Sequence, residues 1–172
     1  MQNSHQSDGA APDPEAGPSH TRADAEAGHA GAQFGLALLL SCGVGDYAQA
    51  AGWYGRAAEQ NHRLAQFNLG QMFAQGQGVE QNEATAVMWI RRAAHGGDAA
   101  AQFFLADRCN RASHQAGDQD APESRIEAYK WFKLSAAQGY GEALARSDFS
   151  TLRMTREEVS EGNRRVTDFV LS

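Results

Sequence analysis

The chain is short of the features that mark membrane, secreted and nucleic-acid-binding proteins. No apolar run approaches the roughly 18 residues of a membrane-spanning helix, and its first residues, MQNSH, hold neither the basic nor the apolar part of a signal peptide. Basic residues are also few, since 15 lysines and arginines stand against 21 acids and the net charge is −6. We therefore expect no membrane span and, without a clustered basic footprint, no nucleic-acid partner.

The first nineteen residues hold little that would enter a core. Pro12, Pro14 and Pro18 lie there among serine, glycine, glutamine and aspartate, a composition typical of disorder. The whole chain of 172 residues, at 42% hydrophobic residues, is long and apolar enough to bury a sizeable core. We predict a disordered tail over 1–19 and a single folded domain over 20–172.

What the chain does have is an internal repeat marked by its three tryptophans. Each is followed twelve residues later by an alanine, in the pairs Trp53 and Ala65, Trp89 and Ala101, and Trp131 and Ala143. The distance from each alanine to the next tryptophan varies, so one connection has a fixed length and the other does not. A period in the thirties is typical of a stacked helical array, in which each unit contacts mainly its neighbours.

The first helix of each unit is predicted from the motif Ala-Gln-Phe, at 32–34, 65–67 and 101–103. A leucine four residues after each alanine continues an apolar stripe. The residue after the leucine is small, which lets a second helix approach to the roughly 8–10 Å of close packing. These pairs are Leu36 and Ala37, Leu69 and Gly70, and Leu105 and Ala106.

The second helix of each unit has a predicted start, apolar face and stop. A residue of the N-cap type lies seven positions before each tryptophan, and a residue able to adopt the left-handed conformation lies eight positions after it. Apolar residues at helical spacing around the tryptophan predict an amphipathic helix. The N-cap residues are Asp46, Asn82 and Ser124, and the terminating residues are Asn61, Gly97 and Gly139.

These motifs resemble the Sel1-like repeat family, relatives of the tetratricopeptide repeats, over about residues 20 to 170. The second unit carries nearly the whole family pattern, including GQGV at 76–79 and RAA at 92–94. The first unit departs from it with a short loop at 42–45, and the third replaces the loop with the long segment Arg111–Glu123. In the third unit Leu134 also stands where the pattern has a basic residue. The resemblance implies an all-α, right-handed superhelical solenoid of about three helix-turn-helix repeats with capping helices.

On this register the folded domain divides into five parts. A partial capping helix over 20–28 precedes repeats over 29–64, 65–100 and 101–142, and a degenerate fourth repeat with a C-terminal cap follows over 143–172. In the last part Thr155 and Glu158 are placed as a capping box, with Met154 and Val159 as its hydrophobic staple, before a helix over about 156–170. Polar-faced ends prevent such an array from stacking without limit.

The two cysteines are expected to be free. Cys42 and Cys109 lie in different units with the whole second unit between them. Two packed layers at roughly 8–10 Å each exceed the Cα separation of about 7 Å that a disulfide allows. Free thiols and the absence of a visible signal peptide predict a cytoplasmic protein, unless a leader has been removed.

No chemical motif predicts catalysis, a cofactor or a metal. The loop 76–78 (GQG) lacks the preceding strand and the surrounding pattern of a phosphate-binding loop. His29, His62 and His95 are each 33 residues apart, but only the first two share a repeat position and no ligand set is completed, so exposed turn histidines are expected. Residues 118–120 (DQD) lack the glycine and glutamate of a calcium loop. We expect no cofactor and no metal site.

One face of the first helices is left for binding. The positions two, six and nine after each opening alanine point away from the apolar stripe. In the Sel1-like family this face lines a concave groove that holds partner segments, so the resemblance implies a partner-binding surface here. Its candidate residues are Phe34, Leu38, Phe67, Asn68, Gln71, Phe103, Asp107 and Asn110.

Two assignments on the surface have alternatives. The phenylalanines of this face are either binding residues or simply pack between neighbouring first helices. Arg91, Arg92 and Lys133 are interpreted as a solvated helix face, with an anion site as the alternative.

The function expected from these features is that of a bacterial-type adaptor or scaffold that holds a protein or peptide partner on its concave face. The main alternative is a structural module whose exposed apolar face self-associates into a homodimer. An enzyme is the third and least supported interpretation, because nothing in the sequence brings a nucleophile, a base and an orienting group together.

Overall fold

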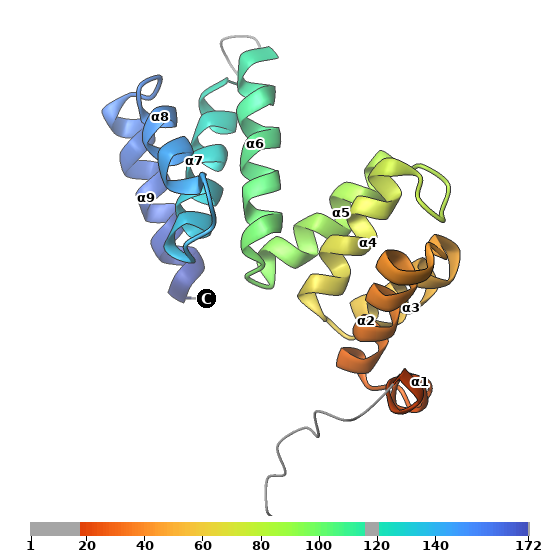
Figure 1. The fold of residues 1–172 in the computed structure, drawn as a ribbon. Helices are drawn as coiled ribbons and strands as arrows, with labels where there is room; N and C mark the ends of the chain where they lie inside the picture. Colours follow the sequence, from red (N-terminus) through yellow and green to blue (C-terminus); the bar gives the residue numbers. More distant parts are fainter. Residues whose placement is uncertain (1–17, 116–120, 172) are drawn as a thin grey trace, which may run out of the picture.

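The structure is a computed structural model that describes residues 18–115 and 121–171. Within these ranges the chain forms helices and no strand, and the helices follow one another as a curved stack of hairpins (Figure 1). This confirms the predicted all-α solenoid. Residues 1–17 of the predicted tail, and the segment 118–120, lie outside the described residues.

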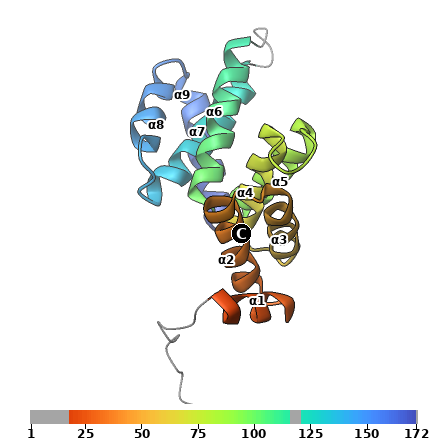
Figure 2. The ribbon, with the colours of Figure 1, turned by 45° about the vertical axis from the view of Figure 1, so that its right-hand side comes forward.

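Each repeat is a pair of helices. The first helices are α2 (Ala30–Leu39), α4 (Arg63–Gln75), α6 (Ala99–Gln115) and α8 (Ala143–Thr151). The second helices are α3 (Tyr47–Glu59), α5 (Glu83–His95), α7 (Ala121–Ala137) and α9 (Arg156–Leu171). A π-helical turn, η1 (Leu40–Val44), extends α2, and α1 (Pro18–Glu26) precedes the first repeat at the end of the stack away from α6–α9 (Figure 1 and Figure 2).

The starts of two second helices are as predicted, and the third is not. The Asp46 carboxylate accepts a hydrogen bond from the amide of Gln49 at 3.0 Å, and the Asn82 side chain accepts from the amide of Thr85 at 2.9 Å. These bonds cap α3 and α5. Ser124 does not cap α7, because that helix begins three residues earlier, at Ala121.

The ends of the second helices follow the prediction throughout. Asn61, Gly97 and Gly139 all have positive φ, at 63°, 83° and 73°. Asn61 is the one residue other than glycine with a positive φ in the described chain. The left-handed conformation lets the chain turn back at once and start the next first helix.

The long loop predicted over 111–123 is largely helical. Helix α6 continues to Gln115 and α7 begins at Ala121, so only 116–120 separates them. The extension is explained by the stripe of α6, which continues at a spacing of four from Leu105 through Cys109 to the buried Ser113. The third repeat therefore has a longer hairpin than the others instead of a longer loop.

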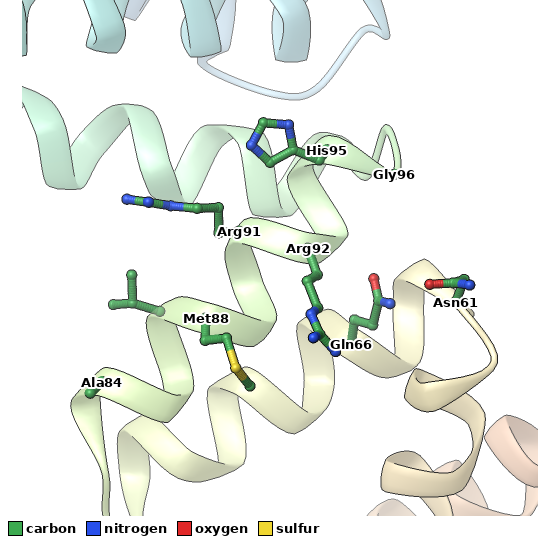
Figure 3. A pocket seen from close by; sticks show the side chains of 9 residues that line it. Asn61, Gln66, Ala84, Met88, Arg91, Arg92, His95 and Gly96 are labelled. Carbon is green, nitrogen blue, oxygen red and sulfur yellow. The ribbon is translucent and has the colours of Figure 1, made fainter.

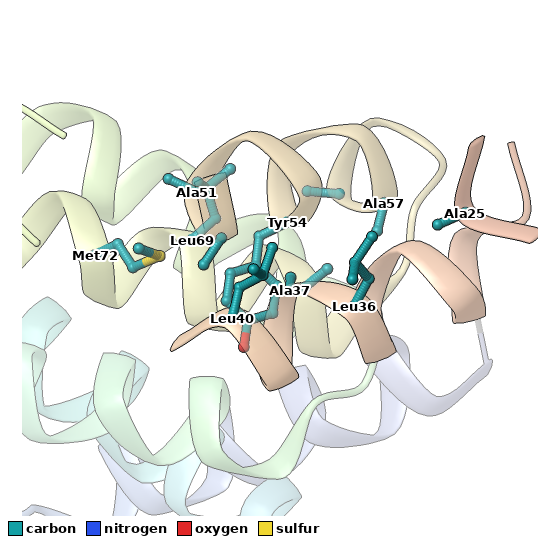
Figure 4. Close-up of a cluster of buried hydrophobic side chains, with 12 residues drawn as sticks. Ala25, Leu36, Ala37, Leu40, Ala51, Tyr54, Ala57, Leu69 and Met72 are labelled. Atoms are coloured by element: carbon teal, nitrogen blue, oxygen red, sulfur yellow. The ribbon is translucent and has the colours of Figure 1, made fainter. Parts of the chain in front are cut away.

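Among the described residues the core forms two clusters. The first joins α1 to α4 and contains Leu36, Leu40, Tyr54 and Leu69 (Figure 4). The second joins α5, α6 and α7 and is centred on Ile90 and other fully or nearly fully buried side chains. Its larger members are Leu105, Trp131, Phe132 and Leu134.

The three tryptophans differ in burial. Trp53 and Trp89 are half-buried, whereas Trp131, at 4% exposed, is buried. The guanidinium of Arg92 covers the ring of Trp89 from the solvent side, 4.9 Å from its centroid. In each repeat the residue directly after the tryptophan enters the core instead, and these residues are Tyr54, Ile90 and Phe132.

The small residues after the leucines allow the close approach that was predicted. Ala37, Gly70 and Ala106 are all buried. A Cβ atom at Gly70 would lie 2.6 Å from Cγ1 of Ile90, so α4 and α5 meet too closely there for any side chain. The loop at 76–79 is a plain connection between α4 and α5.

The glutamine of each Ala-Gln-Phe motif has a structural role that the sequence did not reveal. All three glutamines are buried, and each donates from Nε2 to the carbonyl oxygen eight residues earlier, at the end of the preceding second helix or of α1. A buried carboxamide and a buried carbonyl thus satisfy each other. The pairs are Gln33 and Ala25, Gln66 and Ala58, and Gln102 and Ala94, with distances of 3.0 to 3.1 Å.

Helix α9 closes the array and is bound to α7 by charged groups. The predicted capping box is present, since the Thr155 amide donates to the Glu158 carboxylate at 2.8 Å and the Glu158 amide donates to the Thr155 hydroxyl at 3.2 Å. From the middle of α9 the Arg165 guanidinium donates to Glu123 and Glu127 of α7, at 2.6 and 2.9 Å. These contacts hold the last helix against the third repeat.

Candidate functional site

Part of the predicted binding face forms a hollow between the first and second repeats. Leu38 of α2 and Asn68 and Gln71 of α4 line it together, with a volume of about 560 Å³. Leu38 is 42% exposed, and the two amide side chains are half-buried. Three of the eight candidate residues are therefore brought together, from two different repeats.

The hollow offers both hydrogen-bonding groups and an apolar surface. The hydroxyl groups of Ser41 and Tyr54, 3.4 Å apart, lie in its wall. Gln75 donates from Nε2 to Oε1 of Gln71 at 3.4 Å, and Met72 adds an apolar side chain. Such a mixture suits an extended peptide, whose backbone needs donors and acceptors and whose side chains need apolar contacts.

The phenylalanines of the face are half-buried, and their ring contacts are to second helices and to residues at the turns. Phe34 stacks on His62, with ring centroids 4.7 Å apart. Phe103 meets the edge of Phe132 at 5.6 Å and lies 5.3 Å from Tyr140. Phe67 packs against the second core cluster.

In the third repeat the face is engaged by the neighbouring helix. The Asp107 carboxylate pairs with Arg111 at 3.2 Å and with Arg146 of α8 at 3.5 Å. Asn110 adjoins a small cavity of about 80 Å³ between α6, α7 and α8. Its backbone carbonyl accepts from the Ser113 hydroxyl at 2.7 Å. Asp107 and Asn110 thus lie apart from the hollow formed by the first two repeats.

A larger cavity, of about 930 Å³, lies at α4 and α5 and was not predicted (Figure 3). Of its lining, Arg91 and Arg92 were interpreted from the sequence as a solvated face, with an anion site as the alternative. The sequence feature that could have predicted this cavity is Gly96, because the first and third repeats have glutamine at the same position. The lining residues are Asn61, Gln66, Ala84, Val87, Met88, Arg91, Arg92, His95 and Gly96.

Two histidines, His62 and His95, have lowered pKa values. Burial lowers the pKa of His62, and the charge of Arg63 lowers it further. The His62 ring is half-buried rather than exposed as predicted, and its Nδ1 accepts from the Ala65 amide at 3.3 Å, which caps α4. Burial also lowers the pKa of His95, with a contribution from nearby cations that include Arg91.

The described residues hold no group of three histidine, cysteine or acidic side chains that would bind a metal ion. Cys42 and Cys109 are both free, and burial raises the pKa of the Cys109 thiol. In the same part of the chain no helix is both long and apolar enough to cross a membrane.

The repeat pattern of the helices is that of one known family. The Sel1 repeat family matches the chain three times, over residues 30–62, 63–98 and 99–140. The chain belongs to the Sel1 repeat family. Sel1 repeat proteins generally act as scaffolds in protein–protein interactions, and their fold is typically not catalytic.

Two solved structures show how the Sel1 repeats of this chain compare with others. A protective antigen present in uropathogenic Escherichia coli strains, displaying an SLR fold, is 25% identical, with a TM-score of 0.73. The match covers 88% of this chain but only 32% of that one. A Sel1 repeat protein from Oxalobacter formigenes is 32% identical, with a TM-score of 0.64, over 76% of this chain and 96% of that one. No curated protein matches the chain.

Proposed function

We propose that this Sel1 repeat protein is an adaptor that holds a peptide or protein partner on the face of its first helices. The observation that carries the proposal is the hollow of about 560 Å³ shared by Leu38, Asn68 and Gln71. Two successive repeats contribute to it, so a bound segment would run across the stack. None of the phenylalanines of the face lines this hollow, so its polar residues would supply the specific contacts.

A charge placed in the hollow tests the proposal. Gln71→Arg should weaken capture of any partner recovered with the wild-type chain at least tenfold, because a bulky cation would fill the space and bury unpaired charge. Ser160→Arg on α9 is the matched control, since it adds the same charge at an exposed position. Helicity by circular dichroism should be the same in both variants. A partner captured equally by both would place its binding site elsewhere.

Self-association is a second candidate function, and the apolar side chains of the fourth repeat favour it. Leu144 and Phe149 of α8 and Leu152 after it are 59%, 68% and 77% exposed. Exposed apolar groups that lie close together often mark interfaces. Light scattering over a range of concentrations would detect a dimer, and Phe149→Glu should return it to a monomer. A monomer at all concentrations would remove this candidate and leave the adaptor.

A further inference from the structure

The second repeat lacks a glutamine that, in the first and third repeats, completes a partly buried hydrogen-bonded pair. The position seven residues after the tryptophan is Gln60, Gly96 and Gln138 in the three repeats. Gln60 donates from Nε2 to Oε1 of Gln33, and Gln138 does the same to Gln102, both at 2.8 Å. Glycine at position 96 can make no such bond.

As a result the side chain of Gln66 is only half satisfied. Its Nε2 donates to the Ala58 carbonyl at 3.0 Å, whereas no described residue donates to its Oε1. The side chain belongs to a residue that is only 3% exposed, and it forms part of the wall of the 930 Å³ cavity. Because Gln66 lines the cavity, a donor that enters the cavity could reach this free acceptor.

Neither the backbone nor the space requires a glycine at position 96. Gly96 has φ −74° and ψ 4°, close to the −85° and 17° of Gln60, and any residue adopts such angles. A Cβ atom there would lie 3.4 Å from the carbonyl oxygens of Ala93 and Arg92 and 3.5 Å from Cβ of Arg63, which is ordinary contact. The fold therefore does not require glycine at position 96, and the absence of a side chain there leaves the cavity open.

The cavity also has unpaired positive charge. Arg63, which borders Gly96, and Arg91 and Arg92 in the wall make no ion pair with any acid of the described residues. Figure 3 shows the Arg92 side chain extending beside Gln66. The chain as a whole is acidic, with a net charge of −6, so this local cluster of one sign stands out. Val87 and Met88 supply apolar wall beside it.

These features together define the occupant. An N–H donor would complement Oε1 of Gln66, and carboxylates would complement the guanidinium groups. An apolar group would offer neither of these contacts, and a basic segment would be repelled. We propose that the cavity is a docking site for an acidic segment of a partner protein, which inserts a glutamine side chain where the neighbouring repeats use their own. The site shares no lining residue with the hollow on the first helices, so the two proposals can fail separately.

The test uses the full chain and a defined probe, the peptide acetyl-Gly-Glu-Gln-Asp-Gly-amide, followed by nuclear magnetic resonance of the Gln66 carboxamide and the Trp89 indole. We expect the peptide to shift both signals and to bind about tenfold more tightly than the same peptide with leucine in place of glutamine, since one buried hydrogen bond distinguishes them. Failure of the peptide to shift either signal at millimolar concentration would overturn the proposal.

Gly96→Gln supplies the missing side chain from within the chain. It should weaken peptide binding at least tenfold, because its carboxamide would occupy the acceptor of Gln66. Gly96→Ala is the matched control, which adds the Cβ alone and should change the affinity less than about threefold. Equal binding by Gly96→Gln and wild type would overturn the proposal.

A second variant leaves the cavity open and removes its charge. The double variant Arg91→Gln, Arg92→Gln should weaken binding of the acidic peptide at least tenfold. Binding of the same peptide with neutral flanking residues should remain nearly unchanged. An unchanged affinity for the acidic peptide would contradict the role of the guanidinium groups.

Two outcomes would assign a different occupant. If the peptide binds only after residues 1–17 are removed, the proposal of a partner protein is overturned. The occupant of the cavity would then be the chain's own N-terminal segment. A concentration-dependent dimer that Gly96→Gln abolishes would assign a second copy of the chain instead.

Discussion

The rings of Trp131 and Phe169 meet edge to face, with centroids 5.4 Å apart and planes inclined at 74°. Phe169 lies on α9, so the closing helix supplies the cover that makes Trp131 the buried tryptophan. His95, the last residue of α5, also contacts the Trp131 indole, with ring centroids 5.2 Å apart. The depth of each tryptophan therefore depends on the helices packed against its repeat and not on its position within the repeat.

We predict that Trp131→Ala is the most destabilising of the three tryptophan substitutions. It should cost about 3–5 kcal/mol, as expected for removal of a fully packed indole. Trp89→Ala and Trp53→Ala should cost less, because their rings are half-buried and covered by an arginine side chain. Urea unfolding followed by circular dichroism measures all three, and a larger cost for Trp89→Ala would contradict the burial described above.

Acid should release α9 before the rest of the fold. Hydrogen bonds from Arg125 of α7 and from the Thr155 amide outweigh burial and lower the pKa of Glu158 on α9. Burial alone would raise the pKa of Glu127, but bonds from Lys130 and Arg165 outweigh it and hold the pKa below its usual value. A carboxyl group with a lowered pKa in the folded state stabilises the fold above its unfolded pKa. That stabilisation is lost as the pH falls below about 4.5 and through the lowered pKa values of Glu127 and Glu158.

The measurement is an acid titration followed by the fluorescence of Trp131, compared in two single variants. Arg165→Gln removes the bonds from α9 to Glu123 and Glu127, so α9 should separate at a higher pH than in wild type. Arg164→Gln is the control, because its bonds stay within α9. Equal shifts in the two variants would show that the contacts between α7 and α9 are not what acid disrupts.

Deleting 111–123 should destabilise the third repeat. The deletion removes the end of α6 with the buried Ser113 and the start of α7 with the buried Ala121. We expect loss of cooperative unfolding in the C-terminal part of the chain. Replacing only 116–120 with five glycine and serine residues is the control and should keep the melting temperature within a few degrees. Full stability of the longer deletion would mean that this hairpin extension contributes nothing.

Gly78→Ala should be strongly destabilising. Its φ is +69°, and an added Cβ would lie 2.2 Å from the carbonyl carbon of Tyr47, at the start of α3. Backbone strain and the clash should together cost about 2 kcal/mol or more. Gly55→Ala is the control, since it has nothing within 4 Å and lies inside α3, where alanine is favoured over glycine by about 0.5–1 kcal/mol. Thermal unfolding of the two variants should shift in opposite directions.

The sequence predicted what depends on neighbouring residues. The caps at Asp46 and Asn82 bond to amides three positions away, so their residue type and spacing were sufficient. Ser124 has the same residue type, but the continued stripe of α6 and the earlier start of α7 displaced the helix boundary. A local motif was outweighed there by packing between two helices.

The parts that were missed depend on other elements or on an absent side chain. The burial of Trp131 requires α9, which lies far along the chain. Spacing along the first helices placed the candidate residues on one face. Whether those residues share a hollow depends on the relative orientation of α2 and α4. The cavity beside Gln66 arises because Gly96 lacks a side chain, and a glycine at a helix end ordinarily signals only a turn.

The buried glutamines have a consequence for how such chains lengthen. Each one reaches from the start of a repeat to the last turn of the helix before it, as Gln66 does to Ala58 and Gln102 does to Ala94. A duplicated hairpin would bring its own carboxamide at one end and its own acceptor carbonyl at the other. Unequal recombination can thus insert or remove a whole unit while leaving every joint with a matching donor and acceptor.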